Sequence, residues 1–216
     1  MNKRKRVVMV VGLLLPLLAI AGVWFSMSGP KPAPELSIAR AEALVRPHSP
    51  VLGSSHAKVT LVEFLDPACG TCKLFYPEVK KLLAGQAGKV ELVVRYAPFH
   101  RGSDNMVRML VAAQRQGKFW PVLEKMLETQ QQWAINHQAQ PQIFWQYLGG
   151  MGLDIEQFKL DMKDPAIDAI IKQDLADAAT LGVKKTPDFF VNGQPLPRFG
   201  FQELRDLLLD EVNRVY

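Results

Sequence analysis

Cysteine is nearly absent from this chain: its 216 residues include only two, Cys69 and Cys72, in the stretch DPACGTCK. This scarcity excludes a small exported fold held together by several disulfides. A bridge across a two-residue gap also closes too short a loop to add much stability. The two cysteines therefore indicate chemistry, either as a redox pair or as half of a metal site.

Histidine is scarce as well. The chain has four, His48, His56, His100 and His137, and none stands at the spacing of metal ligands. A tetrahedral zinc site needs further ligands beside a C-x-x-C pair, so we expect no metal site. Copper(I) held by the two cysteines alone stays open as an alternative, because thiolates are soft ligands. His100 is expected to be a surface-loop residue.

Net positive charge is nearly absent beyond the first six residues. The formal net charge is +5, and the segment MNKRKR supplies four of these charges. The remaining chain is close to neutral, which does not indicate the basic patch of a nucleic-acid-binding protein. We therefore expect no nucleic-acid partner.

One long stretch, residues 7–27, has no charged side chain. Following positive charges, it is typical of an export signal, and its 21 residues match the length of a membrane-spanning helix. We favour an uncleaved membrane anchor over residues 1–27. The Ala-Ile-Ala sequence at 19–21 leaves cleavage open. In either case, the positive charges predict that residue 28 and those after it lie across the membrane.

The domain organisation follows from this segment and from a proline-rich stretch. SGPKPAP, residues 28–34, predicts an extended spacer. We expect a linker and N-terminal extension over residues 28–48 and one domain over residues 49–216, which is long enough to bury its own core.

The CGTC motif falls within a predicted strand–helix–strand unit. Residues 58–65 (KVTLVEFL) and 89–96 (KVELVVRY) are short apolar runs typical of buried strands. Between them, apolar side chains recur at helical spacing over residues 70–84. The pattern predicts a βαβ unit of an α/β fold, with the two cysteines at the strand-to-helix turn.

This position predicts different roles for the two cysteines. Free N–H groups at a helix N-terminus stabilise an anion, so Cys69 should be the low-pKa thiolate and remain exposed to a partner. Cys72, one turn into the helix, should be buried and act as the resolving thiol. Gly70 and Thr71 bring no positive charge. We therefore expect a thiolate less stabilised than in a motif with histidine between the cysteines.

Residues from about 103 to 182 have mainly helical patterns, which predict an inserted helical layer with Ser103 as an N-cap. The chain then returns to the sheet with DFFVNG, whose Asn192-Gly193 pair indicates a hairpin, and ends with a helix over 201–214. The spacing of the aromatic residues in the insertion favours core positions, although a peptide groove of a substrate-binding or chaperone module stays open. These residues are Phe119, Trp120, Trp133, Phe144, Trp145 and Tyr147.

The order of several motifs carries a family resemblance. CGTC is followed by RYAPFH after the second strand, QGKFW in the insertion and LGVKKTPDFFVNG near the end. In this order the sequence resembles the DsbA-like branch of the thioredoxin superfamily. The resemblance implies a thioredoxin-like α/β fold with an inserted helical domain. It also implies thiol–disulfide exchange with protein substrates on the periplasmic side of the bacterial envelope, no cofactor, and a membrane redox partner that recycles the cysteine pair.

The resemblance also implies roles for further residues. Thr186-Pro187 matches the family's cis-proline loop, which faces the C-x-x-C and pairs with a bound substrate segment. Gly70 and Thr71 are expected to be additional substrate contacts. Glu63 matches the acid that the family keeps buried below its active site, and we expect it to carry protons to and from Cys72. Alternatively, strand alternation turns Glu63 to solvent.

The resemblance leaves the direction of exchange open. Strongly oxidising members carry CPHC and a valine before the cis-proline, whereas CGTC and Thr186 look more like the isomerases and reductases. The family's isomerases are dimers built on an N-terminal dimerisation domain. Residues 35–48 are too few for such a domain.

Overall fold

The computed structural model describes residues 38–136 and 138–216. The expected anchor and spacer, residues 1–34, lie outside this range. Among the described residues, no helix is both long and apolar enough to cross a membrane.

A five-stranded mixed sheet forms the centre of the fold, in the order β1-β3-β2-β6-β7. The two long central strands, β2 and β3, are parallel and joined by α3, as the apolar runs predict for a βαβ unit. The other neighbouring pairs are antiparallel. The strands are β1 (Val51–Leu52), β2 (Val59–Leu65), β3 (Val90–Tyr96), β6 (Asp188–Val191) and β7 (Gln194–Pro195).

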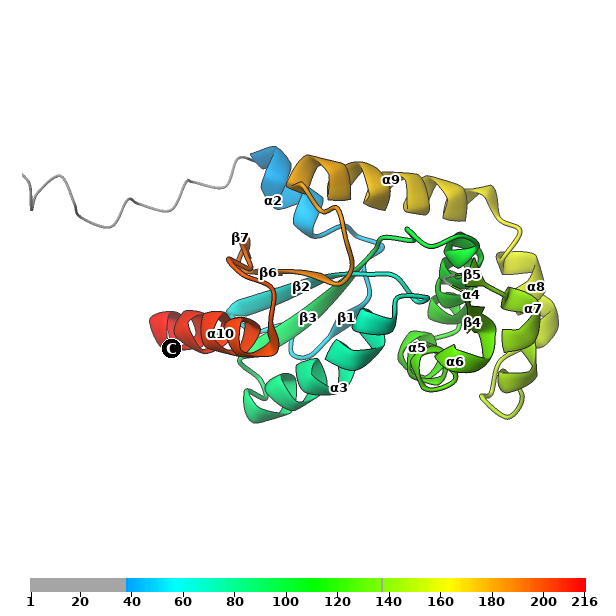
Figure 1. Cartoon of the computed structure of the whole chain (residues 1–216), viewed down its shortest axis with the longest axis horizontal. Coiled ribbons are helices and arrows are strands. Elements are labelled where there is room, and N and C mark those ends of the chain that lie inside the picture. Colours follow the sequence, from blue (N-terminus) through cyan, green and yellow to red (C-terminus); the bar gives the residue numbers. More distant parts are fainter. Residues whose placement is uncertain (1–37, 137) are drawn as a thin grey trace, which may run out of the picture. The chain divides into compact units, whose positions relative to one another are not determined.

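Helices cover both faces of the sheet. In Figure 1, α3 (Gly70–Gly85) and α10 (Phe201–Val215) lie on one face, and α2 (Ile38–Leu44) and α9 (Pro165–Leu181) lie on the other. Strand alternation divides β2 between the two cores, because Leu61 and Leu65 pack on the α3 side while the intervening apolar residues pack on the α9 side. Both faces are therefore buried, which explains why β2 and β3 are apolar throughout.

The chain between β3 and α9 forms a helical layer at one end of the sheet (Figure 1). Trp133, Phe144 and Phe158 are fully buried within it. The prediction that the aromatic residues of the insertion are mainly core residues is therefore right for Phe119, Trp133 and Phe144. The other three, Trp120, Trp145 and Tyr147, are partly buried and pack against the same core. The layer contains α4 (Ser103–Arg115), α5 (Phe119–Glu128), α6 (Gln130–Trp133), α7 (Pro141–Phe144), the 3-10 helix η1 (Trp145–Tyr147), α8 (Ile155–Asp161), and the small hairpin of β4 (Ala134–Ile135) and β5 (Gln138–Ala139).

The prediction of Ser103 as an N-cap is wrong. Gly102 occupies the cap position with φ 77°, and Ser103 is the first helical residue. The hydroxyl of Ser103 donates to the carboxylate of Asp66, which follows β2. Local capping rules predict that the Ser103 side chain bonds to the start of its own helix, but it bonds to a distant segment of the chain instead.

The end of the chain returns to the sheet as the sequence predicts. Asn192 and Gly193 turn the chain with φ values of 47° and 81°, and β6 pairs with β7. Two positive φ values in succession are typical of the hairpin turn that Asn-Gly favours. Directly before β6, the Thr186–Pro187 peptide bond is cis.

Candidate active site

The CGTC motif starts at the turn that leaves β2 and enters α3. Cys69 is the N-cap of α3, with φ −77° and ψ 117°, and its N–H donates to the carbonyl of Asp66 at 3.0 Å. No side chain caps this helix end. The N–H groups of its first turn are therefore available to the Cys69 sulfur.

The two thiols are free and have opposite pKa shifts. The pKa of Cys69 is lowered to about 5, mainly by a hydrogen bond from the Cys72 thiol, and further by Thr186 and by the backbone N–H groups of Cys72 and Thr71. Burial raises the pKa of Cys72 well above its ordinary value. Near neutral pH, Cys69 is thus a thiolate beside a protonated Cys72.

Both cysteines are largely buried, which corrects the expectation that Cys69 is open to a partner. Cys69 keeps 6% of its surface exposed and Cys72 none. Cys69 is more exposed than Cys72, as expected, but a partner must approach its sulfur through a small opening. Gly70, directly beside it, is exposed and has no atom within 4 Å of where a Cβ would stand. Thr71 is partly buried.

The loop before β6 brings Thr186 to the first cysteine. The Sγ atom of Cys69 lies 3.1 Å from the carbonyl oxygen of Thr186, and in its protonated form the thiol donates to it. Thr186 is partly buried and Pro187 is buried. The structure therefore brings together the CGTC turn and the cis-proline loop.

Glu63 lies inside the protein, so the alternative that it faces solvent is wrong. Its exposure is 0%, and among the described residues neither carboxyl oxygen has a hydrogen-bond partner. Burial, with a further contribution from the charge of Cys69, raises the pKa of Glu63 to about 8. Its charge in turn contributes to the raised pKa of Cys72.

Several residues around the motif were missed by the sequence reasoning. Asp66 is fully buried, and its carboxylate accepts from the N–H of Ala68 at 2.9 Å, from the N–H of His100 at 2.8 Å and from the Ser103 hydroxyl. The Nδ1 atom of His100 is 2.7 Å from the same carboxylate. His100 is therefore not a simple surface-loop residue. The one available signal was an acidic residue directly between an apolar strand and the cysteine motif.

Gln130, from α6 of the helical layer, is the second residue that the sequence did not reveal. It is 5% exposed, and its Nε2 atom donates to the carbonyl oxygens of Pro67 and Cys69. One polar residue in a run of three glutamines gives no sequence signal for this contact.

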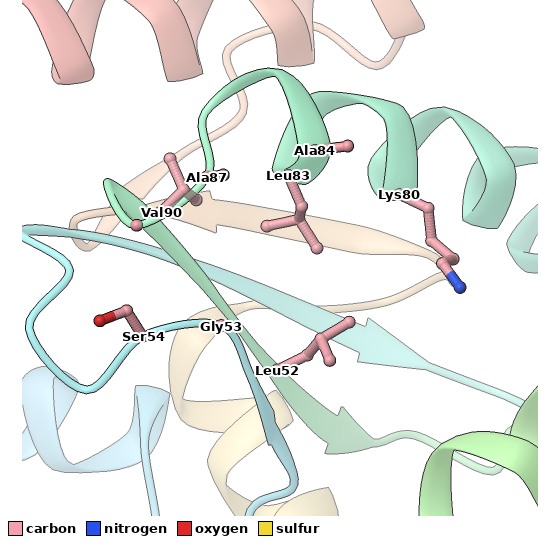
Figure 2. A pocket seen from close by; sticks show the side chains of 9 residues that line it. Leu52, Gly53, Ser54, Lys80, Leu83, Ala84, Ala87 and Val90 are labelled. Carbon is pink, nitrogen blue, oxygen red and sulfur yellow. The ribbon is translucent and has the colours of Figure 1, made fainter.

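Other parts of the structure do not add to this site. Within residues 38–136 and 138–216, no group of three or more His, Cys, Asp or Glu residues is arranged to hold a metal ion. A mainly apolar cleft of about 440 Å³ near the end of α3 contains none of the candidate residues. Figure 2 shows Leu52 and Leu83 facing one another across it.

Comparison with known proteins agrees with this geometry. A family model described as Thioredoxin matches residues 46–208. The chain belongs to the thioredoxin family. It has the DsbA-like thioredoxin fold that the order of its motifs implies. It is similar to the structure of a thioredoxin-like oxidoreductase from Silicibacter pomeroyi DSS-3, with 31% identity, a TM-score of 0.69, and coverage of 81% of this chain and 98% of that one.

Two curated relatives extend the comparison of this thioredoxin-family chain. Disulfide bond formation protein D from Bacillus subtilis is 24% identical over 180 residues, which cover 76% of this chain and 77% of that protein. The Na(+)/H(+) antiporter NhaA from Herminiimonas arsenicoxydans is 33% identical over 146 residues, covering 68% of this chain. The match spans only 22% of the antiporter's own length.

Proposed function

We propose that this chain exchanges disulfides with protein substrates outside the cytoplasm, with Cys69 and Cys72 as its redox pair. The observation that carries the proposal is the position of the pair: Cys69 is the N-cap of α3, and Cys72 lies fully buried one turn into the helix. The pKa shifts, to about 5 for Cys69 and well above the ordinary value for Cys72, agree with these positions. Exchange needs one thiolate ready to attack and a second thiol that stays protonated until the first has reacted. This pair has that asymmetry.

The reductive direction has two steps. The Cys69 thiolate attacks one sulfur of a substrate disulfide, and the other substrate sulfur leaves as a thiolate and takes a proton from water. The charge of the Cys69 thiolate, which helps to raise the pKa of Glu63, is lost in the mixed disulfide. Glu63 in its ionised form takes the proton of Cys72, whose thiolate then attacks the Sγ atom of Cys69. The second substrate sulfur leaves as a thiolate and takes the proton from Glu63, so the substrate carries two thiols and the enzyme keeps the Cys69–Cys72 disulfide. The same steps in reverse oxidise a substrate dithiol.

Partner binding is assigned to the surface around the first cysteine. The Thr186-Pro187 loop, 3.1 Å from the Cys69 sulfur, orients the incoming segment. Gly70 leaves open space beside it, and Thr71 borders the same turn. A substrate disulfide thereby reaches the thiolate although Cys69 has little exposed surface.

We place this activity on the periplasmic side of the inner membrane, with residues 7–27 as the anchor and a membrane redox partner that recycles the pair. The support is the charge-free stretch that follows MNKRKR. A membrane-impermeant maleimide should label Cys69 in intact spheroplasts. Labelling that requires lysis contradicts the location.

The exchange role is tested by trapping. A Cys72→Ala variant of the full chain should accumulate a mixed disulfide with an unfolded protein that carries a disulfide, because the resolving step is lost. A Cys69→Ser variant should form none. Exchange at the parent's rate by Cys69→Ser refutes the assignment of the nucleophile.

The reduction potential of the Cys69–Cys72 pair, measured by equilibration with glutathione, gives the direction of disulfide exchange. A potential near about −120 mV indicates a disulfide donor, and one near about −250 mV or below indicates a protein that works from the reduced state.

A further inference from the structure

One side chain of the helical layer holds the active-site turn. The Nε2 atom of Gln130 donates to the carbonyl of Pro67 at 2.8 Å and to the carbonyl of Cys69 at 3.0 Å. The two acceptors are 63 and 61 residues away in sequence. Gln130 is nearly fully buried, so these bonds are shielded from water.

The carbonyl of Cys69 belongs to the same peptide unit as the N–H of Gly70. Because glycine has no Cβ, its backbone accepts many orientations, and here it faces open space on the protein surface. Local chain preference therefore fixes this peptide only weakly. Within the helix, the Cys69 carbonyl also accepts from Lys73 at 3.2 Å. The amide of Gln130 supplies the contact from outside the helix.

The opposite side of the turn is held by the same layer. The carboxylate of Asp66 accepts from Ser103, the first residue of α4, and from His100 in the preceding loop. The carbonyl of Asp66 accepts from the N–H of Cys69, and the backbone N–H of Asp66 donates to the sulfur of Cys72. The helical layer thus hydrogen-bonds to the turn at the carboxylate of Asp66 on one side and at the carbonyls of Pro67 and Cys69 on the other.

We propose that Gln130 is a positioning residue for Cys69, which holds the first turn of α3 so that its N–H groups point at the Cys69 sulfur. The inference rests on the proposed function in that Cys69 is the nucleophile. Without the amide, two buried carbonyls lose a donor, and the peptide at Gly70 is free to rotate to recover one. The N–H groups of Thr71 and Cys72 then lose their alignment with the Cys69 thiolate. Because these N–H groups stabilise the thiolate, the reduced form of the protein becomes less stable relative to the disulfide form.

The experiment uses the full chain and three variants. Gln130→Met keeps the side-chain length and removes the donor, Gln130→Glu also removes it and adds negative charge, and Gln131→Ala changes an exposed neighbour in the same short helix. Two quantities are measured for each: the pH midpoint of iodoacetamide alkylation at Cys69, located by mass, and the equilibrium constant with glutathione. Unfolding in urea is followed in parallel.

We expect Gln130→Met to raise the alkylation midpoint and to shift the glutathione equilibrium at least threefold toward the disulfide. Gln130→Glu should shift both further, and Gln131→Ala should match the parent. If Gln130→Met lowers the free energy of unfolding but leaves both thiol measurements at the parent's values, Gln130 has only a structural role and the proposal is wrong.

Failure of the proposed function is distinguishable from failure of this inference. The function fails if Cys69→Ser exchanges disulfides as the parent does. The positioning role fails if the midpoint of Cys69 itself does not move. If neither glutamine variant folds, Gln130→Asn, whose shorter amide reaches at most one of the two carbonyls, should give an intermediate midpoint, and a midpoint equal to the parent's overturns the proposal.

Discussion

The Sγ atom of Cys69 and the carbonyl oxygen of Thr186 lie 3.1 Å apart, although 117 residues separate them in the chain. The sheet produces this contact, because β2 pairs with β6 and places Phe64 opposite Asp188. The turn that follows β2 and the loop that precedes β6 therefore meet at the same edge. The residue proposed to orient a partner also touches the sulfur that attacks it.

Removing the hydroxyl of Thr186 should make the Cys69 thiolate less stable and so raise the pKa of Cys69. The side chain of Thr186 is among the groups that lower the pKa of Cys69 to about 5. Thr186→Val keeps the shape but deletes the donor, so the pKa of Cys69 should rise. Thr186→Ser keeps the donor and should stay near the parent. Ultraviolet absorbance of the thiolate, followed against pH, measures the midpoint, and equal midpoints for valine and threonine contradict the assignment.

Glu63 should make the folded protein less stable as pH rises. Its pKa is about 8 in the folded protein and 4.5 ordinarily, so the unfolded chain releases this proton first. Between these values the unfolded state binds fewer protons, and the free energy of unfolding falls with pH by up to about 1.4 kcal/mol per unit. In Glu63→Gln this contribution should vanish.

The measurement is urea unfolding at several pH values from about 5 to 8. The disulfide form is used, so that Cys69 does not titrate. Burial is the main cause of the raised pKa of Glu63 and remains in that form. Glu91→Gln, at a partly buried position on β3, is the matched control and should keep the parent's pH dependence. A parent and a Glu63→Gln variant with parallel pH profiles count against a buried protonated acid.

The sequence was sufficient where structure is local. Apolar runs and turn residues predicted β2, α3, β3 and the Asn192–Gly193 hairpin, because their signals lie within a few residues of each other. The apolar neighbours of Glu63 along β2 are also a local signal, because they indicate a strand buried on both faces. The cis bond at Pro187 came only from the family resemblance.

The surroundings of the cysteines were beyond local reasoning. Asp66 is joined to His100 and Ser103 over 34 and 37 residues, and Gln130 reaches back 61 residues to Cys69. These contacts depend on how the helical layer docks on the sheet, and no periodicity or motif encodes that docking. Ser103 shows the limit directly: it has the residue type of a cap, but its hydroxyl goes to Asp66.

A buried charge network on the opposite face of the sheet should contribute strongly to stability. Arg95 is fully buried and lies 2.7 Å from Asp174 and 2.6 Å from Asp177, and Asp174 also accepts from the N–H of Tyr96. Asp174→Asn removes one of the two negative charges that neutralise the buried guanidinium of Arg95. The free energy of unfolding should fall by about 3–5 kcal/mol.

An exposed pair supplies the comparison for this network. Glu78 and Lys81 form an ion pair within α3 whose side chains are both exposed. Glu78→Gln should change the free energy of unfolding by no more than about 0.5 kcal/mol. Urea unfolding at one pH measures both variants, and similar small losses in the two would mean that the buried network adds no more than a surface pair.

Gly102 should tolerate substitution less well than Gly117, although both have a positive φ, 77° and 67°. A Cβ at Gly102 would stand 2.7 Å from the carbonyl oxygen of Ala139, whereas one at Gly117 would meet nothing within 4 Å. Gly117→Ala should therefore cost only the backbone strain, about 1 kcal/mol, and Gly102→Ala should cost clearly more because backbone must move.

The position of Gly102 gives this comparison a second readout. It lies between His100 and Ser103, which both contact the carboxylate of Asp66 beneath the cysteine turn. Displacing this loop should change the alkylation midpoint of Cys69 as well as stability, while Gly117→Ala should change stability alone. Equal unfolding losses for the two alanine variants, with no change at Cys69 in either, would show that the loop yields freely and does not hold the turn.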